Sequence, residues 1–196
     1  IVLKRHALNE LIEASNSGQV VVIGYTYMIW QHLLYSYEND VNLNLGINTK
    51  LVHFGGWKKL NELNITKKNL LKKIESNLNL PSHSVYDIYG FTEQLGTVYV
   101  AEGEEGCLVS DYSHLIVRDP ITLHPVKDGE IGFLQFMSIL PTSYPGFSIL
   151  NDDLGSITER KISSDGREIV KFNVLSRLEK AESRGCGDTL PDNFYI

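Results

Sequence analysis

Three strand-like runs divide the first half of the chain, and helical patterns separate them. The runs cover residues 20–23, 51–54 and 84–89, and the helical patterns cover residues 4–17, 26–37 and 66–78. The continuous apolar run over residues 20–23 is typical of a strand that is buried on both faces. A strand–helix–strand–helix–strand order at this spacing predicts a parallel sheet with right-handed crossovers and flanking helices.

The pattern changes near Thr97, after which short β-forming segments alternate with turns. These segments cover residues 98–101, 107–110, 115–118, 131–137, 147–150, 155–160 and 169–175. Asp128-Gly129 and Asp165-Gly166 are typical hairpin turns. We therefore predict an α/β fold in which a partly parallel sheet is followed by an antiparallel β subdomain. The predicted domains are an α/β lobe over residues 1–96, the β subdomain over 97–177 and a polar tail over 178–196.

Charge and hydropathy argue against two kinds of partner. The formal net charge is −6, and non-specific nucleic-acid binding depends on Lys and Arg that neutralise phosphates. The dense basic run over residues 67–73 is interpreted as the solvated face of an amphipathic helix. No apolar run approaches the roughly 20 residues that a membrane span needs.

The start of the chain and its cysteines bear on its location. The sequence starts at Ile1 without a signal-peptide pattern, so we expect it to begin inside a longer protein. Without an export signal a reducing cytoplasm is expected, where Cys107 and Cys186 are predicted to be free thiols. No Cys-x-x-Cys and no His pair has the spacing of a zinc site.

The most informative string is Tyr-Asp-Ile-Tyr-Gly-Phe-Thr-Glu over residues 86–93. A strand leads into Gly90, and Thr92 and Glu93 follow at the strand end that faces the ligand crevice in a parallel sheet. A hydroxyl there can donate to a phosphate, and a carboxylate can hold Mg²⁺ together with phosphate oxygens. Local physics alone favours the alternative that Thr92 caps a helix and Glu93 occupies its first turn.

Three further strings carry possible chemistry, each with a structural alternative. Residues 54–58, Phe-Gly-Gly-Trp-Lys, let a ligand approach the backbone closely or form a plain turn. Residues 151–155, Asn-Asp-Asp-Leu-Gly, offer a carboxylate that can accept two hydroxyls or form a hairpin turn. In the string Ser-Arg at 176–177, Arg177 either has a functional role or is an ordinary arginine on a surface strand. His53, beside the two glycines, either contacts a substrate or is a satisfied strand histidine.

Together these strings resemble the motifs of the adenylate-forming superfamily, which includes acyl-CoA synthetases, luciferases and peptide-synthetase adenylation domains. Tyr-Gly-Phe-Thr-Glu is similar to that family's Tyr-Gly-x-Thr-Glu, and Asp-Asp-Leu-Gly is similar to Gly-Asp-Leu-Gly. The resemblance implies ATP and Mg²⁺ as cofactors. The implied ATP-binding residues are Tyr89, Gly90, Thr92, Asp153 and Arg177. Tyr89 would lie near adenine and Asp153 at the ribose, with the neighbouring Asp152 as the alternative carboxylate.

The same resemblance assigns the catalytic and substrate-binding residues. Thr92 would contact the α-phosphate and Glu93 would bind the metal, which makes both catalytic. Gly55, Gly56 and Trp57 would contact the substrate.

One subfamily matches at five places in the same order. Residues 55–58, 119–126, 142–145, 152–155 and 184–186 resemble the acyl-protein synthetases of bacterial luminescence, the LuxE type. The resemblance runs over nearly all of the chain but covers only the later part of that family. The family's Ser/Thr/Gly-rich phosphate loop has no counterpart in these 196 residues, and neither has a full C-terminal domain.

This resemblance implies a reaction in two steps. A carboxylic acid, expected to be a fatty acid, is activated by ATP to acyl-AMP, and a thiol then takes the acyl group. Cys186 is the predicted catalytic thiol because it lies between two glycines in the polar tail, and an acyl reductase is the implied protein partner. The alternatives are a CoA ligase similar to phenylacetate-CoA ligase, or a non-catalytic remnant that binds nucleotide or a partner.

Overall fold

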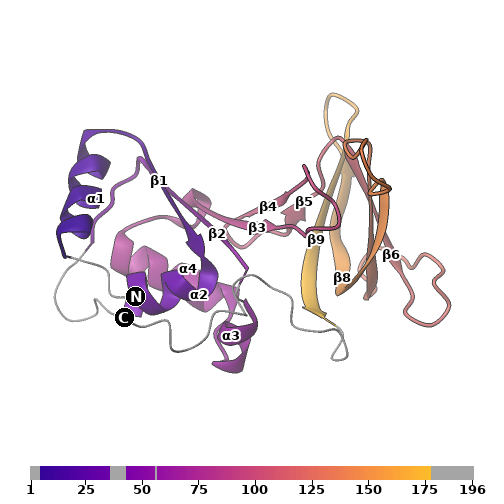
Figure 1. Ribbon diagram of the computed structural model, residues 1–196, viewed down its shortest axis with the longest axis horizontal. Coiled ribbons are helices and arrows are strands. Elements are labelled where there is room, and N and C mark those ends of the chain that lie inside the picture. Colours follow the sequence, from indigo (N-terminus) through magenta and orange to yellow (C-terminus); the bar gives the residue numbers. More distant parts are fainter. Residues whose placement is uncertain (1–4, 36–42, 56, 178–196) are drawn as a thin grey trace. The chain divides into compact units, whose positions relative to one another are not determined.

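The computed structural model describes residues 5–35, 43–55 and 57–177 and divides into two compact units. Among the described residues, the first unit runs through Ile88 and includes Glu102–Glu104, and the second holds Tyr89–Ala101 and residues 105–177. The described residues form a mixed α/β fold with nine strands, partly parallel, as predicted (Figure 1). The Tyr-Gly-Phe-Thr-Glu string begins the second unit, whereas the sequence pattern placed it at the end of the first lobe.

The first unit alternates strands and helices. Its elements are α1 (Arg5–Ser17), β1 (Val20–Tyr25), α2 (Thr26–Met28), the π-helix η1 (Ile29–Tyr35), β2 (Thr49–Phe54), α3 (Trp57–Glu62), α4 (Lys67–Leu78), the 3-10 helix η2 (Ser82–Ser84) and β3 (Val85–Tyr89). The strand order is β1-β2-β3 and both pairings are parallel, which confirms the predicted parallel sheet. Of the helix predicted over residues 26–37, residues 26–35 are helical, as the short α2 followed by a π-helix, and residues 36–37 lie outside the described residues.

Helix α4 illustrates how the sequence sets these elements. The Thr66 hydroxyl accepts a hydrogen bond from the Asn69 backbone N–H at 3.2 Å. The Asn69 side chain in turn accepts one from the Thr66 backbone N–H, which completes a capping box. Asn79 ends the helix in the left-handed conformation. The buried residues of α4 are Leu70, Leu71, Ile74 and Leu78. The basic run therefore lies on an amphipathic helix, as predicted.

The helices of this unit pack against one face of its sheet. Leu51 of β2 and Val85 of β3 belong to the same buried cluster as the apolar residues of α4. Side chains alternate between the two faces of a strand, and on the opposite face Val21 and Ile23 of β1 are 58% and 65% exposed. His53 shares the covered face with Leu51.

The second unit is an antiparallel β structure, as predicted. Its strands are β4 (Tyr99–Glu102), β5 (Cys107–Leu108), β6 (Ser113–Arg118), β7 (Gly132–Ser138), β8 (Ser148–Ile162) and β9 (Glu168–Arg177), in the order β4-β5-β9-β8-β7-β6. The prediction of two separate strands at 147–150 and 155–160 is wrong, because β8 is continuous. The register of β8 against β9 shifts between Leu154 and Gly155. A Cβ at Gly155 would lie 2.2 Å from the Asn173 carbonyl oxygen, so glycine permits this close approach.

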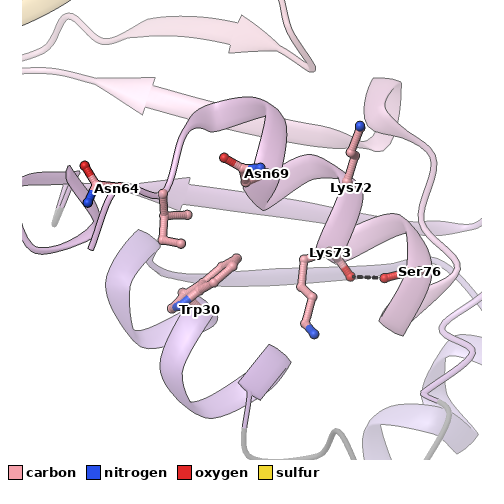
Figure 2. Close-up of a pocket in the computed structure, with 7 residues that line it drawn as sticks. Trp30, Asn64, Asn69, Lys72, Lys73 and Ser76 are labelled. Atoms are coloured by element: carbon pink, nitrogen blue, oxygen red, sulfur yellow. Dashed lines mark hydrogen bonds between the residues drawn. The ribbon is translucent and has the colours of Figure 1, made fainter. Parts of the chain in front are cut away.

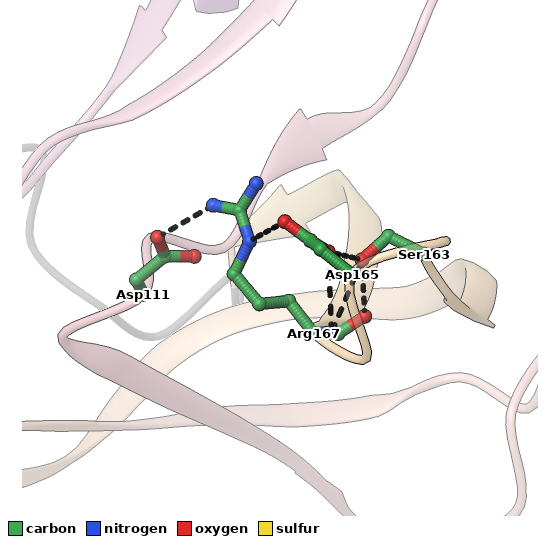
Figure 3. A network of polar contacts seen from close by, with 4 residues as sticks. All are labelled: Asp111, Ser163, Asp165 and Arg167. Atoms are coloured by element: carbon green, nitrogen blue, oxygen red, sulfur yellow. Dashed lines mark hydrogen bonds and ion pairs between the residues drawn. The ribbon is translucent and has the colours of Figure 1, made fainter.

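The predicted turn at Asp165-Gly166 connects β8 to β9 (Figure 3). Gly166 has the positive φ of +83° that favours glycine. Arg167 donates from Nε to Asp165 at 2.8 Å and from Nη1 to Asp111 at 3.1 Å. Hydrogen bonds from Ser163 and Arg167 lower the pKa of Asp165 to about 2. This exposed network braces the hairpin.

Within the described residues, no helix is both long and apolar enough to cross a membrane.

Candidate nucleotide and acyl site

Tyr89 connects the aromatic core of the second unit to a polar rim. Its ring packs at centroid distances of 5.8 Å from Phe136 and 5.9 Å from Phe172. Its hydroxyl donates to Asp153 Oδ2 at 2.7 Å and accepts a hydrogen bond from Asn151 Nδ2 at 2.9 Å. Two of the predicted motifs, 64 residues apart in the sequence, therefore meet through a direct hydrogen bond.

Strand β8 determines which of the two neighbouring carboxylates faces Tyr89. Because side chains alternate along a strand, Asn151 and Asp153 share one face and Asp152 lies on the other. Asp152 is exposed, which is consistent with this alternation. The backbone of Arg177 in β9 lies directly opposite Asp153 in the register. Tyr89, Asp153 and the backbone of Arg177 thus form one neighbourhood, and Asn151 belongs to it although the sequence interpretation gave it no role.

Thr92 and Glu93 lie exposed in the turn that follows Gly90. The Thr92 hydroxyl donates to Glu93 Oε2 at 3.3 Å. In the described chain no helix begins between Gly90 and Tyr99, so the alternative that these residues start a helix is wrong. The next residue, Gln94, is buried, and its Oε1 accepts a hydrogen bond from the Tyr99 hydroxyl at 2.8 Å. This bond anchors the turn from inside and leaves the two polar side chains outward.

The fold does not require a glycine at position 90. Gly90 is exposed and is not among the glycines with positive φ. A Cβ there would lie 3.5 Å from Val98 Cγ1, which is an ordinary van der Waals distance. Neither backbone conformation nor packing therefore explains why this position is a glycine.

The first unit holds the predicted Gly-Gly-Trp string at the end of β2. Gly55 has a φ of +57°, and Gly56 lies outside the described residues. Trp57 begins α3, and its Nε1–H donates to Asp87 Oδ2 at 3.2 Å. The sequence interpretation missed Asp87, although its place two residues before Tyr89 on β3 was a usable signal. The string is thus a strand end followed by a short helix that the sequence did not predict.

The two ring nitrogens of His53 lie in different surroundings. Its Nδ1 lies 2.9 Å from the Thr26 hydroxyl and 3.5 Å from Asp87 Oδ1. Its Nε2 is buried and has no hydrogen-bond partner among the residues that the structure describes. Burial lowers the pKa of His53, the Asp87 carboxylate opposes this shift, and the positive charge of Lys67 adds to it. The imidazole is therefore neutral at neutral pH.

A pocket of about 490 Å³ also lies in the first unit, between η1 and α4 (Figure 2). It is lined by Trp30, Asn64, Ile65, Asn69, Lys72, Lys73 and Ser76. Figure 2 shows Lys73 extending on the same side of α4 as Trp30, and Lys72 extending to the other side. None of the predicted site residues that the structure describes lines this pocket.

Metal-ligating side chains do not cluster in the described part of the chain, where no group of three or more His, Cys, Asp or Glu side chains could hold a metal ion. The exposed Glu93 beside Thr92 could therefore ligate Mg²⁺ only together with phosphate oxygens, as the sequence predicted. Cys107 is buried in β5, as expected for a strand residue. Cys186 lies outside the described residues.

The fold is similar to part of the fold of several solved CoA ligases. A 2-hydroxyisobutyryl-CoA ligase in complex with 2-HIB-AMP and CoA is similar with a TM-score of 0.66 and 17% identity, over 92% of this chain and 38% of that one. The O-succinylbenzoate coenzyme A synthetase of Bacillus subtilis, in complex with ATP and magnesium, gives 0.54 and 14%, over 87% of this chain and 34% of that one. These similarities identify the fold class of the chain.

The chain belongs to the acyl-protein synthetase family, LuxE, whose sequence profile matches residues 2–195. It is 26% identical to the long-chain-fatty-acid–luciferin-component ligase of Aliivibrio fischeri, over 91% of this chain and 47% of the relative. The corresponding ligase of Vibrio harveyi is 24% identical, over 91% and 46%. The predicted family is confirmed, and the chain spans about half the length of the curated relatives it matches.

Proposed function

We propose that this chain provides the nucleotide-binding part of an enzyme that activates a fatty acid as its acyl-adenylate and transfers the acyl group to a thiol. The observation that supports this most is the partly buried hydrogen bond between Tyr89 and Asp153, because it joins two family motifs. Membership of the LuxE family and the fatty-acid ligase names of its relatives support the reaction class.

The polar residues around Tyr89 each suit one part of ATP. An ionised carboxylate has about four acceptor sites, so Asp153 can accept from ribose hydroxyls while it holds the Tyr89 hydroxyl. The Thr92 hydroxyl can donate to the α-phosphate, and Glu93 can ligate Mg²⁺. Bound Mg²⁺ would neutralise charge that develops on the phosphates. Gly90 keeps the backbone between these groups open.

The acyl acceptor proposed here is the thiol of Cys186. The thiolate attacks the carbonyl carbon of acyl-AMP, the thioester C–S bond forms, and the C–O bond to AMP breaks so that AMP leaves. Arg184, two residues away in the sequence, would enrich the thiolate by lowering the thiol pKa. An acyl reductase would then take the acyl group from the thioester. Gly55, Gly56 and Trp57 are proposed to contact the acid.

Product analysis tests this function and separates it from its alternatives. Acyl-AMP is supplied to the chain, and mass spectrometry then looks for a hydroxylamine-sensitive acyl adduct. We expect the adduct on Cys186 and its loss in Cys186→Ala, with Cys107→Ala as the matched control. An adduct that persists in Cys186→Ala contradicts the assignment, and acylation of added CoA alone would favour a CoA ligase. Neither product would favour a binding protein.

We further propose that these 196 residues do not adenylate acids by themselves, since the chain spans about half the length of its relatives. Phosphate-cradling loops bind triphosphate largely through backbone N–H groups, and the sequence contains no such loop. Pyrophosphate release is measured with a range of fatty and aryl acids. Robust release by this chain alone would contradict this part of the proposal.

A further inference from the structure

His53 lies at the centre of a largely buried polar cluster in the first unit. Strand β2, which carries it, is the middle strand of β1-β2-β3, and the side chain is 1% exposed. His53 and Asp87 are direct register partners on β2 and β3. Thr26, at the start of α2, is fully buried and contacts His53 Nδ1 through its hydroxyl. Three elements therefore converge on one imidazole.

The same cluster holds the indole of Trp57. Asp87 uses Oδ1 toward His53 and Oδ2 to accept the Trp57 Nε1–H. The rings of His53 and Trp57 meet edge to face, with centroids 5.9 Å apart. Trp57 is thus tied to His53 twice, once through Asp87 and once through the ring contact. Because Trp57 begins α3 shortly after β2 ends at Phe54, this tie also fixes where α3 begins relative to β2.

The geometry favours one tautomer of His53. An N–H at Nδ1 would point toward the Thr26 oxygen and the Asp87 carboxylate, whereas a lone pair there would face negative charge at 3.5 Å. The proton is therefore assigned to Nδ1, and Nε2 is left as a buried acceptor without a partner among the described residues. An apolar residue of similar size would fill this position without leaving such an atom. What the histidine adds is the directed bond at Nδ1.

We propose that His53 is a positioning residue that acts through Asp87 to fix the Trp57 indole, and with it the start of α3. This inference rests on the proposed function in one respect only, which is that Trp57 contacts the acyl substrate. The positioning itself is a property of the first unit. Two measurements therefore keep the two statements separate.

The first measurement reports on the indole alone. The chain has two tryptophans and ten tyrosines, so Trp30→Phe leaves Trp57 as the sole tryptophan, and excitation at the red edge of the absorption band, where tyrosine does not absorb, selects it. In His53→Asn the amide nitrogen takes the place of Nδ1, and in His53→Gln it takes the place of Nε2. We expect His53→Gln to raise acrylamide quenching of Trp57 about fivefold, the equilibrium factor for one lost hydrogen bond, and His53→Asn to raise it less than about twofold. Equal quenching in the two variants would overturn the proposal.

Stability and ligand affinity complete the experiment. Urea unfolding of both variants shows whether quenching simply follows loss of stability, and a strict correlation would reduce His53 to a core residue. The affinity for dodecanoyl-sulfamoyl-adenosine, a stable mimic of a fatty acyl-adenylate, is expected to fall about tenfold in His53→Gln and to be largely rescued in His53→Asn. Selective quenching with unchanged affinity would keep the positioning role and overturn the assignment of Trp57 to the substrate.

Discussion

The two units place polar residues in opposite settings. In the first unit the polar cluster of His53, Thr26 and Asp87 lies inside the fold, and its members bind one another and Trp57. In the second unit Thr92 and Glu93 lie exposed at the rim of an aromatic core. Apart from His53 Nε2, the polar atoms of the first cluster are held by contacts within the fold, so this cluster contributes to structure. Thr92 and Glu93 are exposed, and their substitution is therefore expected to change stability little.

The largest expected difference in stability is between alanine substitutions at two glycines of the second unit. Gly155→Ala should lower the free energy of unfolding by about 3 kcal/mol, because the new Cβ would collide with backbone 2.2 Å away. Gly90→Ala should change it by less than ~0.5 kcal/mol, since its Cβ meets only an ordinary contact. Urea unfolding measures both. A large loss at Gly90 would mean that the fold, rather than a ligand, requires that glycine.

Removal of the Tyr89 hydroxyl tests the link between core and rim. Tyr89→Phe keeps the ring contacts and removes the bonds to Asp153 and Asn151. We expect a loss of about 1 kcal/mol in unfolding free energy, the net value of a typical hydrogen bond. Tyr112→Phe, at an exposed tyrosine, is the control and should be neutral. A neutral Tyr89→Phe would indicate that water replaces the bond at no cost.

Acid should weaken the first unit through its buried histidine. Burial lowers the pKa of folded His53 below its ordinary value of 6.5, so the unfolded chain binds more protons. The contribution of His53 is therefore fully present above pH 6.5 and is lost as the pH falls through its folded pKa. Urea unfolding between about pH 7 and pH 5 should show this decline, and His53→Asn should flatten it. His32, whose pKa burial also lowers, requires the parallel variant His32→Asn, which should flatten the decline less.

Glu93→Gln should have the smallest effect on folding. Glu93 is exposed and begins no helix, so the unfolding free energy should change by less than ~0.5 kcal/mol. In an active protein that contains this chain, acid-dependent pyrophosphate release should nevertheless fall sharply, because the charge that would hold Mg²⁺ is gone. Glu104→Gln, at another exposed glutamate, is the control. Full turnover in Glu93→Gln would remove Glu93 from the metal site.

Sequence reasoning succeeded where the signal was local or periodic. The strand runs and the Thr66 cap are such signals, and the structure contains both. It failed at residues 151–155, where Asn, Asp and Gly favour a turn but the partner strand β9 keeps β8 continuous. The six-residue α3 was missed because so short a helix has no clear period. Family motifs suggested Tyr89 and Asp153 separately, but their contact depends on how distant strands pair.

The most direct test of the central claim compares two neighbouring carboxylates on β8. Asp153 contacts the Tyr89 hydroxyl, whereas Asp152 is exposed on the other face of the strand. Binding of dodecanoyl-sulfamoyl-adenosine is measured by calorimetry for the wild-type chain, Asp153→Asn and Asp152→Asn. The account predicts that Asp153→Asn weakens binding by at least about tenfold, the loss of a charge-assisted hydrogen bond, while Asp152→Asn stays near wild type. Equal effects of the two substitutions, or no binding by the wild-type chain, would contradict it.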